Sequence, residues 1–197
     1  MAGAANGEGL LSQSLLTSSS TLGFMQREMV LLKRLRWLTW VFIVGLVISG
    51  VTAIPLVTEL NWLSQVLGTG NSASIEGAGS LAFWLESVRH ALIDSQAKHP
   101  FLFYGTDWLA FGHIIIAVAF IGVLRDPVRN RWLLDFGLIA CAMVIPWAFI
   151  FGALREIPFW WRLIDCSFGV FGAIPLWWCR KWAKELESCR VGDRRSG

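Results

Sequence analysis

The chain has 197 residues, of which 55% are hydrophobic and 16% are charged, and its formal net charge is +3. This composition suits one membrane domain with short connections and leaves room for little else. The basic residues flank apolar stretches and do not form a stripe on one soluble face. This distribution argues against a nucleic-acid-binding surface.

At the N-terminus, residues 1–21 are rich in Gly, Ala, Ser and Leu and contain one charged residue. We expect a disordered cytoplasmic tail. In residues 22–36, Leu22, Met25, Met29 and Leu32 recur at helical spacing, and the basic residues lie elsewhere on the surface. This pattern predicts an interfacial amphipathic helix that lies on the cytoplasmic membrane surface and runs into the first span.

Four apolar stretches come next, each close to the ~20 residues that an α-helix needs to cross a hydrocarbon core. They are Trp37–Leu60, Phe101–Leu124, Trp132–Leu154 and Phe159–Trp178. The predicted fold is all-α: an integral membrane four-helix bundle, formed by a single four-span domain over residues 37–182, with a cytoplasmic tail at 183–197. A proline lies inside the first, third and fourth spans and should kink each helix, namely Pro55, Pro146 and Pro175.

The connection between the first two spans, residues 61–100, is unusually long for a membrane bundle. Its first half contains Gly68–Ser80, which has the composition of a flexible loop. Its second half, residues 81–98, predicts an amphipathic helix over the bundle mouth or in the outer interface. The apolar side of that helix is formed by Phe83, Leu85, Val88, Leu92 and Ile93.

The other connections are short, which forces spans two, three and four into an antiparallel up-down-up unit. Small residues recur in span two, at Gly105, Gly112 and Ala119, and flank one turn of span four, at Gly169 and Gly172. Such residues allow close contact between membrane helices.

Thirteen of the 17 Lys and Arg residues precede the first span, lie between spans two and three, or follow the fourth span, and the other four lie in or near the other two connections. The positive-inside rule therefore predicts a multi-pass protein of a bacterial inner membrane with both termini in the cytoplasm. The 12 Trp residues agree, because most fall at the expected membrane boundaries, where indole rings collect.

Ionisable residues at membrane depth are costly and usually have a function or a partner. Asp107 and Asp165 each lie six residues inward from the outer end of a span, at about 9 Å depth. Arg162 lies one turn above Asp165, and Arg155 and Glu156 lie on the outer turn. One hypothesis is a polar pocket in the outer half of the bundle, with His113 deeper, that binds a cation, a proton or a polar headgroup. The other is that Arg162 neutralises an aspartate and holds helices together.

His113 by itself does not predict a metal or haem site, because membrane b-haem needs histidines from two helices and His113 does not share a helix face with Asp107. The four cysteines form no CxxC motif, which argues against a zinc site and a disulfide-exchange enzyme. Asp135 lies in the first turn of the third span, where the helix dipole favours a negative charge. We therefore expect no metal and no cofactor.

Familiar nucleotide, protease and esterase motifs are absent from the sequence. The leading interpretation is a non-catalytic accessory, sensory or ligand-binding module of the membrane. The alternative is a small transporter or membrane enzyme that acts on a lipid or quinone through the outer polar pocket. The expected partners are the lipid bilayer, a lipid or quinone ligand, a second copy of the chain or a partner membrane protein, with no nucleic acid.

Overall fold

The computed structural model describes residues 4–67 and 81–196, with side chains at 22–67 and 81–191. Every regular element in these ranges is a helix, which confirms the all-α prediction. The predicted flexible loop Gly68–Ser80 lies outside the described residues. The elements are α1 (Ala4–Thr52), α2 (Leu56–Leu67), α3 (Leu81–Lys98), the short 3₁₀ helix η2 (Pro100–Phe103), α4 (Tyr104–Arg125), α5 (Arg131–Leu154) and α6 (Phe159–Ser196).

Three helical stretches of the described chain are long and apolar enough to cross a membrane: Leu22–Thr52, Pro100–Arg125 and Arg131–Leu154. They overlap the first three predicted spans. The fourth predicted span, residues 159–178, forms the first half of α6 but is not among them. Its mean hydropathy is lowered by Arg162 and Asp165 and by the tryptophans near its two ends.

The two ends of the chain differ from the predicted tails. Helix α1 begins at Ala4, inside the segment expected to be disordered, and α6 continues through residues 183–196. Adding residues to an existing helix costs far less than nucleating one, so long helices extend readily at their ends. Helix α1 also passes without interruption through residues 22–36 into the first apolar stretch.

The first and last helices pack against each other beyond the apolar stretches. Leu31 and Leu35 of α1 are buried in one cluster with Ala183 and Leu186 of α6. The apolar stripe that suggested membrane contact includes Leu22, Met25 and Met29, and these side chains stay exposed. Leu32, the fourth member of the stripe, is partly buried against this cluster. The stripe identified from periodicity therefore packs only at its C-terminal end, and the fully buried residues lie beside it.

Pro55 breaks the first predicted span instead of kinking it. Helix α1 ends at Thr52, and α2 begins at Leu56 after a turn in which Ala53 donates to the carbonyl of Gly50. The Pro55 carbonyl accepts a hydrogen bond from the amide of Glu59, so the proline starts the next helix. This position suits proline, because the first residues of a helix need no amide donor.

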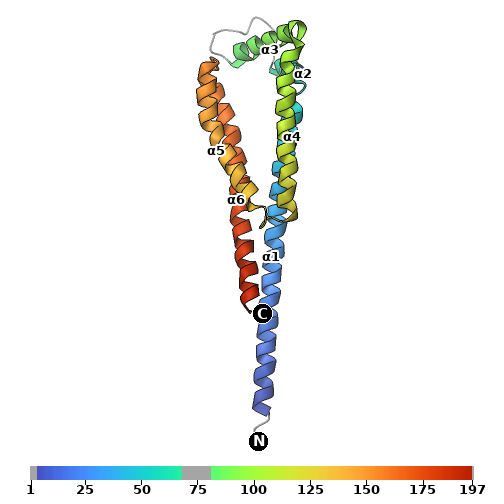
Figure 1. Cartoon of the computed structure of the whole chain (residues 1–197), viewed down its shortest axis with the longest axis vertical. Helices are drawn as coiled ribbons and strands as arrows, with labels where there is room; N and C mark the ends of the chain where they lie inside the picture. Colours follow the sequence, from blue (N-terminus) through green and yellow to red (C-terminus); the bar gives the residue numbers. More distant parts are fainter. Residues whose placement is uncertain (1–3, 68–80, 197) are drawn as a thin grey trace.

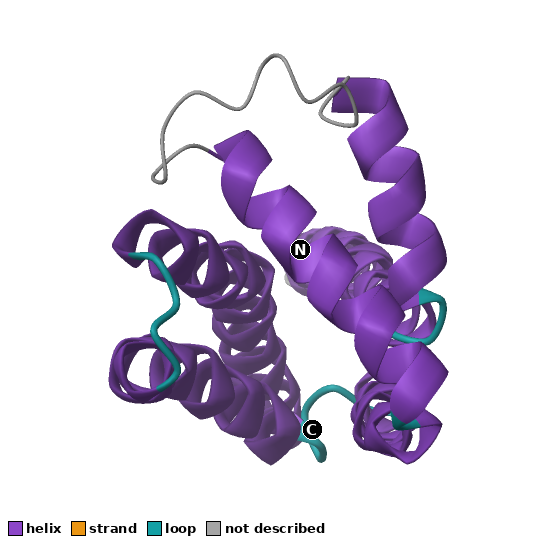
Figure 2. Ribbon diagram, turned by 90° about the horizontal axis from the view of Figure 1, so that it is seen from above, coloured by secondary structure: helices purple, strands orange, loops and turns teal. Residues whose placement is uncertain are grey.

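The helices form two antiparallel pairs, α1 with α4 and α5 with α6, and α1 also packs on α6. Figure 1 shows the two pairs close together near the level where α4 turns into α5, and apart at the end that carries α2 and α3. Both chain termini lie at the opposite end, with α1 extending past the end of α6 (Figure 1). Seen from above, α2 and α3 cross the end of the molecule that lies opposite the termini (Figure 2).

The hydrophobic core lies where the two pairs meet. Phe120 and Val123 of α4, Leu134 of α5 and Leu176 of α6 are completely or almost completely buried there. The ring of Phe120 packs 4.8 Å from that of Phe42 on α1, measured between centroids. All four long helices therefore contribute to one core, and this core lies toward the end of the molecule that carries the termini.

Close helix approach occurs at some of the predicted small residues and not at others. A Cβ added at Gly169 would lie 2.5 Å from the carbonyl oxygen of Cys141, and one at Gly172 would lie 3.0 Å from the Cys141 sulfur. In α4, a Cβ added at Gly105 or Gly112 would meet nothing within 4 Å in the described structure. The tightest of these contacts is therefore between α5 and α6.

Candidate functional site

Asp107 lies on α4 with its side chain exposed. It lines a surface pocket of about 240 Å³ with Tyr104, Trp108 and Phe111, all from the same helix. Asp107 is 13 residues from Phe120, which turns it about 140° away from that core residue at 3.6 residues per turn. The carboxylate therefore points away from the other helix pair.

Asp165 lies half-buried on α6. It lines a pocket of about 470 Å³ whose other lining residues come from α5: Ala140, Met143, Val144, Trp147 and Ala148. Asp165 shares a helix face with Gly172 and Cys179, which follow at intervals of seven residues. Those two residues face α1, because a Cβ at Gly172 would lie 3.8 Å from Phe42 and the Cys179 sulfur lies 3.7 Å from the Leu35 carbonyl. Asp165 thus occupies the inner face of α6, in the part where the pairs diverge.

The two aspartates line separate pockets on different helix pairs. Their sequence positions predicted that the two aspartates lie at the same height, but they did not determine which face of its helix each aspartate occupies. The structure does not bring Asp107, Asp165, Arg162 and His113 into one site.

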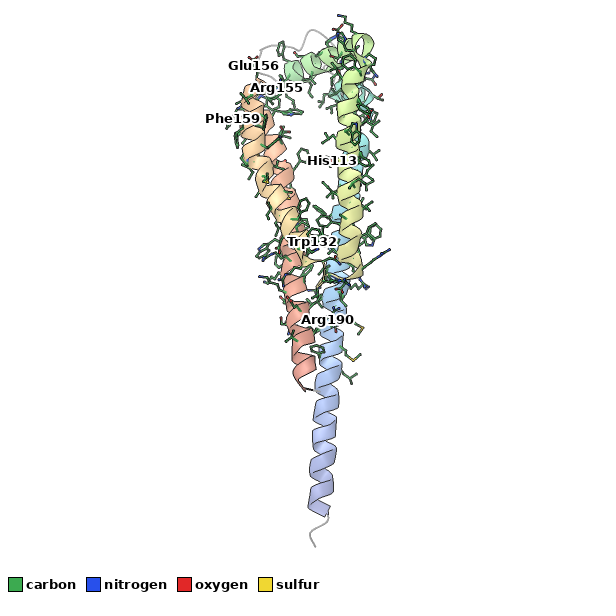
Figure 3. All side chains as sticks on the ribbon, in the orientation of Figure 1. His113, Trp132, Arg155, Glu156, Phe159 and Arg190 are labelled. Atoms are coloured by element: carbon green, nitrogen blue, oxygen red, sulfur yellow. The ribbon has the colours of Figure 1, made fainter. Side chains whose placement is uncertain are left out.

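His113 is half-buried where α4 crosses α1. Its Nδ1 lies 2.8 Å from the carbonyl oxygen of Leu109, one turn earlier in the same helix, and can donate to it. A Cβ added at Gly50 of α1 would lie 2.9 Å from the His113 Cβ, so the two helices pack here too closely to admit a side chain at position 50. Figure 3 shows His113 on α4 at a level between Trp132 and the turn that carries Arg155 and Glu156.

Arg162 holds the turn between α5 and α6. Its Nε donates to the carbonyl oxygen of Ile157 at 2.8 Å. Its side chain covers Gly152, since a Cβ added there would lie 2.8 Å from the Arg162 Cγ. Arg155 and Glu156 are exposed in this turn, and Glu156 has a positive φ of 56°, a conformation that the tight turn requires. These contacts give Arg162 a structural role in the turn.

Interhelical ion pairs gather on the side of the molecule that carries the termini. Asp135, which we expected the helix dipole to stabilise, pairs with Arg180 of α6. Arg190 pairs with Glu28 of α1 at 3.1 Å and approaches Asp126 at 3.8 Å. Two further pairs among the described side chains are Arg131 with Glu187 and Arg27 with Glu185. Residues 184–190 carry charges of both signs, and this was the sequence signal for the network. Because these residues were predicted to belong to a tail at 183–197, no ion pairs were expected from them.

A second polar cluster joins α2 to α3 at the end of the molecule opposite the termini. The guanidinium of Arg89 binds the carboxylate of Glu86, with Nε 3.0 Å from Oε2, and also donates to the side chain of Asn61 at 3.1 Å. Ser64 donates to the same carboxylate at 3.3 Å, and the His90 ring lies 2.9 Å from it. The hydrogen bond from Arg89 lowers the pKa of Glu86 below its usual range, against the opposing effect of burial. This cluster holds α3 on α2, and no local pattern in the sequence marks any of its members as a site.

In the described parts of the chain, no three His, Cys, Asp or Glu side chains are grouped so that they could hold a metal ion. Comparison of the whole chain with protein-family models, curated proteins and solved structures finds no match.

Proposed function

We propose that the chain is a multi-pass protein of a bacterial inner membrane that crosses the bilayer four times, with residues 159–178 of α6 as the fourth span. The packing of α6 along α5 supports this topology, as does the common position of both termini at one end of the molecule (Figure 1). An even number of crossings requires both ends on one side, and the excess of basic residues there favours the cytoplasm.

Within this topology the protein acts as a non-catalytic accessory module. The observation that carries this proposal is the separation of the groups that could do chemistry. Asp107 faces away from the bundle, His113 and Arg162 interact with nearby backbone carbonyls, and Asp165 has apolar neighbours. A general acid–base or cation-coordinating site needs such groups within hydrogen-bond reach of a common point.

The ion-pair network supports an accessory role. At 1.5 Å per residue, α1 is about 74 Å long, more than twice the ~30 Å of a hydrocarbon core. Its first half therefore extends outside the bilayer, and Glu28–Arg190 and Arg27–Glu185 join α1 to the end of α6. Through this cytoplasmic helix pair the chain would engage a partner membrane protein or a second copy.

A second candidate function is transport through the Asp165 pocket. A carboxylate on the inner face of α6, in a pocket of about 470 Å³, is the arrangement in this chain that most resembles a proton or cation site. This candidate function depends on Asp165 and does not involve Asp107.

Reconstituted liposomes distinguish the two candidates. Protein in vesicles loaded with a pH-sensitive dye is subjected to a potassium diffusion potential, and proton entry is compared for the wild type, Asp165→Asn and the control Asp107→Asn. If the protein is an accessory module, proton entry in all three proteins should equal the leak into protein-free vesicles. Proton entry that is lost only in Asp165→Asn would refute the accessory role and establish the second candidate.

A further inference from the structure

A groove runs along α5 and α6 on the face opposite the Asp165 pocket. Leu138, Ala142 and Ile145 line it from α5, and Gly169, Ala173 and Ile174 line it from α6. Ala142, in this groove, and Ala140, in the Asp165 pocket, are two positions apart and so point about 160° from each other on the helix. The groove therefore faces away from the other helix pair, toward the surrounding membrane.

The groove has the size of a ligand site and the length of one membrane leaflet. Its volume is about 560 Å³, inside the ~300–1,000 Å³ range of small-molecule sites. From Gly169 to Trp178 it extends about 13 Å along α6 at 1.5 Å per residue. A single leaflet accounts for about half of the ~30 Å hydrocarbon core, so an acyl chain of one leaflet fits this length.

The cytoplasmic end of the groove carries a cation above two indole rings. Trp177 and Trp178 close the groove, and the Nζ of Lys181 lies 5.8 Å and 5.5 Å from their ring centroids. Tryptophan at a membrane boundary marks the headgroup level. Lys181 therefore lies one turn beyond the acyl-chain groove, at the height of a lipid phosphate.

Lys181 has no anionic partner among the described side chains, in contrast to two arginines near it. Arg180 is paired with Asp135, and Arg131 is paired with Glu187. The cation–π contacts orient the Lys181 ammonium without neutralising its charge. Its positive charge is thus available to an anion from outside the chain.

We propose that this groove is a binding site for an anionic phospholipid of the inner leaflet, with one acyl chain between α5 and α6 and the phosphate on Lys181. The apolar lining selects a hydrocarbon chain, and the unneutralised ammonium selects an anionic over a zwitterionic headgroup. One lysine at a membrane surface contributes about a five-fold preference for an anionic lipid, and screening by salt reduces it.

Native mass spectrometry of the full chain tests the site. Protein released from nanodiscs containing equal amounts of phosphatidylglycerol and phosphatidylcholine with the same acyl chains is compared as wild type, Lys181→Gln and Lys33→Gln. Lys33 is an exposed lysine of α1 on the same side of the membrane and controls for general surface charge. The expected result is preferential retention of phosphatidylglycerol, reduced about five-fold in Lys181→Gln and unchanged in Lys33→Gln.

The groove is tested separately by filling it. Ala142 is exposed, so Ala142→Trp should fold normally and exclude the acyl chain, whereas Ala140→Trp on the opposite face is the matched control. Retention of both lipids should fall only in Ala142→Trp. Equal lipid retention in these two variants, or equal effects of Lys181→Gln and Lys33→Gln, would overturn the proposal. So would a protein dimer that disappears in Ala142→Trp, because the groove would then be an interface between copies.

Discussion

The close crossing of α5 and α6 predicts an unusual cost for adding a single methyl group at Gly169. A Cβ there would lie 2.5 Å from the Cys141 carbonyl oxygen, whereas real Cβ contacts essentially never fall below 3.0 Å. The two helices must therefore separate by about 0.5 Å, and a gap of that size removes about a quarter of the attraction of each affected contact. Because the obstacle is backbone, no side-chain rotation relieves it.

The magnitude follows from comparison with Gly112 in α4, where an added Cβ meets nothing within 4 Å. Both Gly→Ala changes gain about 0.5–1 kcal/mol from helix propensity, so that contribution cancels between the two sites. Overpacking costs about 1–3 kcal/mol. We therefore expect Gly169→Ala to be about 1–3 kcal/mol less stable than Gly112→Ala, with a larger difference between Gly169→Leu and Gly112→Leu.

The assay is equilibrium unfolding in mixed micelles, in which SDS is titrated into a maltoside detergent. Unfolding is followed by tryptophan fluorescence and by circular dichroism, and the 12 tryptophans give a strong signal. Equal unfolding free energies for Gly169→Leu and Gly112→Leu would refute the reasoning, because the two helices would then not approach each other as closely as the structure has them.

Three further predictions concern other parts of the molecule. Phe120→Ala should lower the unfolding free energy by about 3–5 kcal/mol in the same assay, whereas Phe111→Ala, at an exposed position of the same helix, should cost far less. Reversing the charge of Asp135 or of Arg180 alone should lower the unfolding free energy, and reversing both should recover about 0.2–1 kcal/mol in a double-mutant cycle. Strict additivity of the two single effects would contradict the pairing. Because the folded-state pKa of Glu86 is lowered, its contribution to holding α3 on α2 should be fully present above the usual glutamate pKa and lost as pH falls through the lowered value. Amide exchange of residues 81–98, followed as pH is lowered, should show this loss in the wild type, and a Glu86→Gln variant with the same pH dependence would contradict it.

The helix bounds predicted between residues 81 and 154 agree closely with the structure. The bounds predicted for the outer helix, 81–98, are those of α3, and the apolar stretches at 101–124 and 132–154 lie within helices. Runs of about 20 apolar residues dictate helices in a bilayer, because only an internally hydrogen-bonded backbone avoids unsatisfied polar groups there. The Pro55 break shows the limit of this rule, since the sequence predicted a kink and α1 ends at Thr52.

The candidate site could not be predicted to the same degree. Sequence position gave Asp107 and Asp165 the same height, but the face that each helix presents depends on how the helices pack as pairs. The ion pairs of Asp135 and Arg190 join residues 45 and 162 positions apart, and no local pattern relates such distant residues.

The sequence by itself determined the helical class, the approximate extent of the apolar helices and the uneven distribution of positive charge, because each follows from neighbouring residues and from the solvent that they prefer. Only the tertiary structure decided that the helices associate as two pairs which meet at one end, that Asp165 faces inward while Asp107 faces outward, and that a groove ends beneath Lys181. Those features depend on the rotation of each helix about its axis, which is fixed by contacts such as that of Gly169 with the backbone of α5.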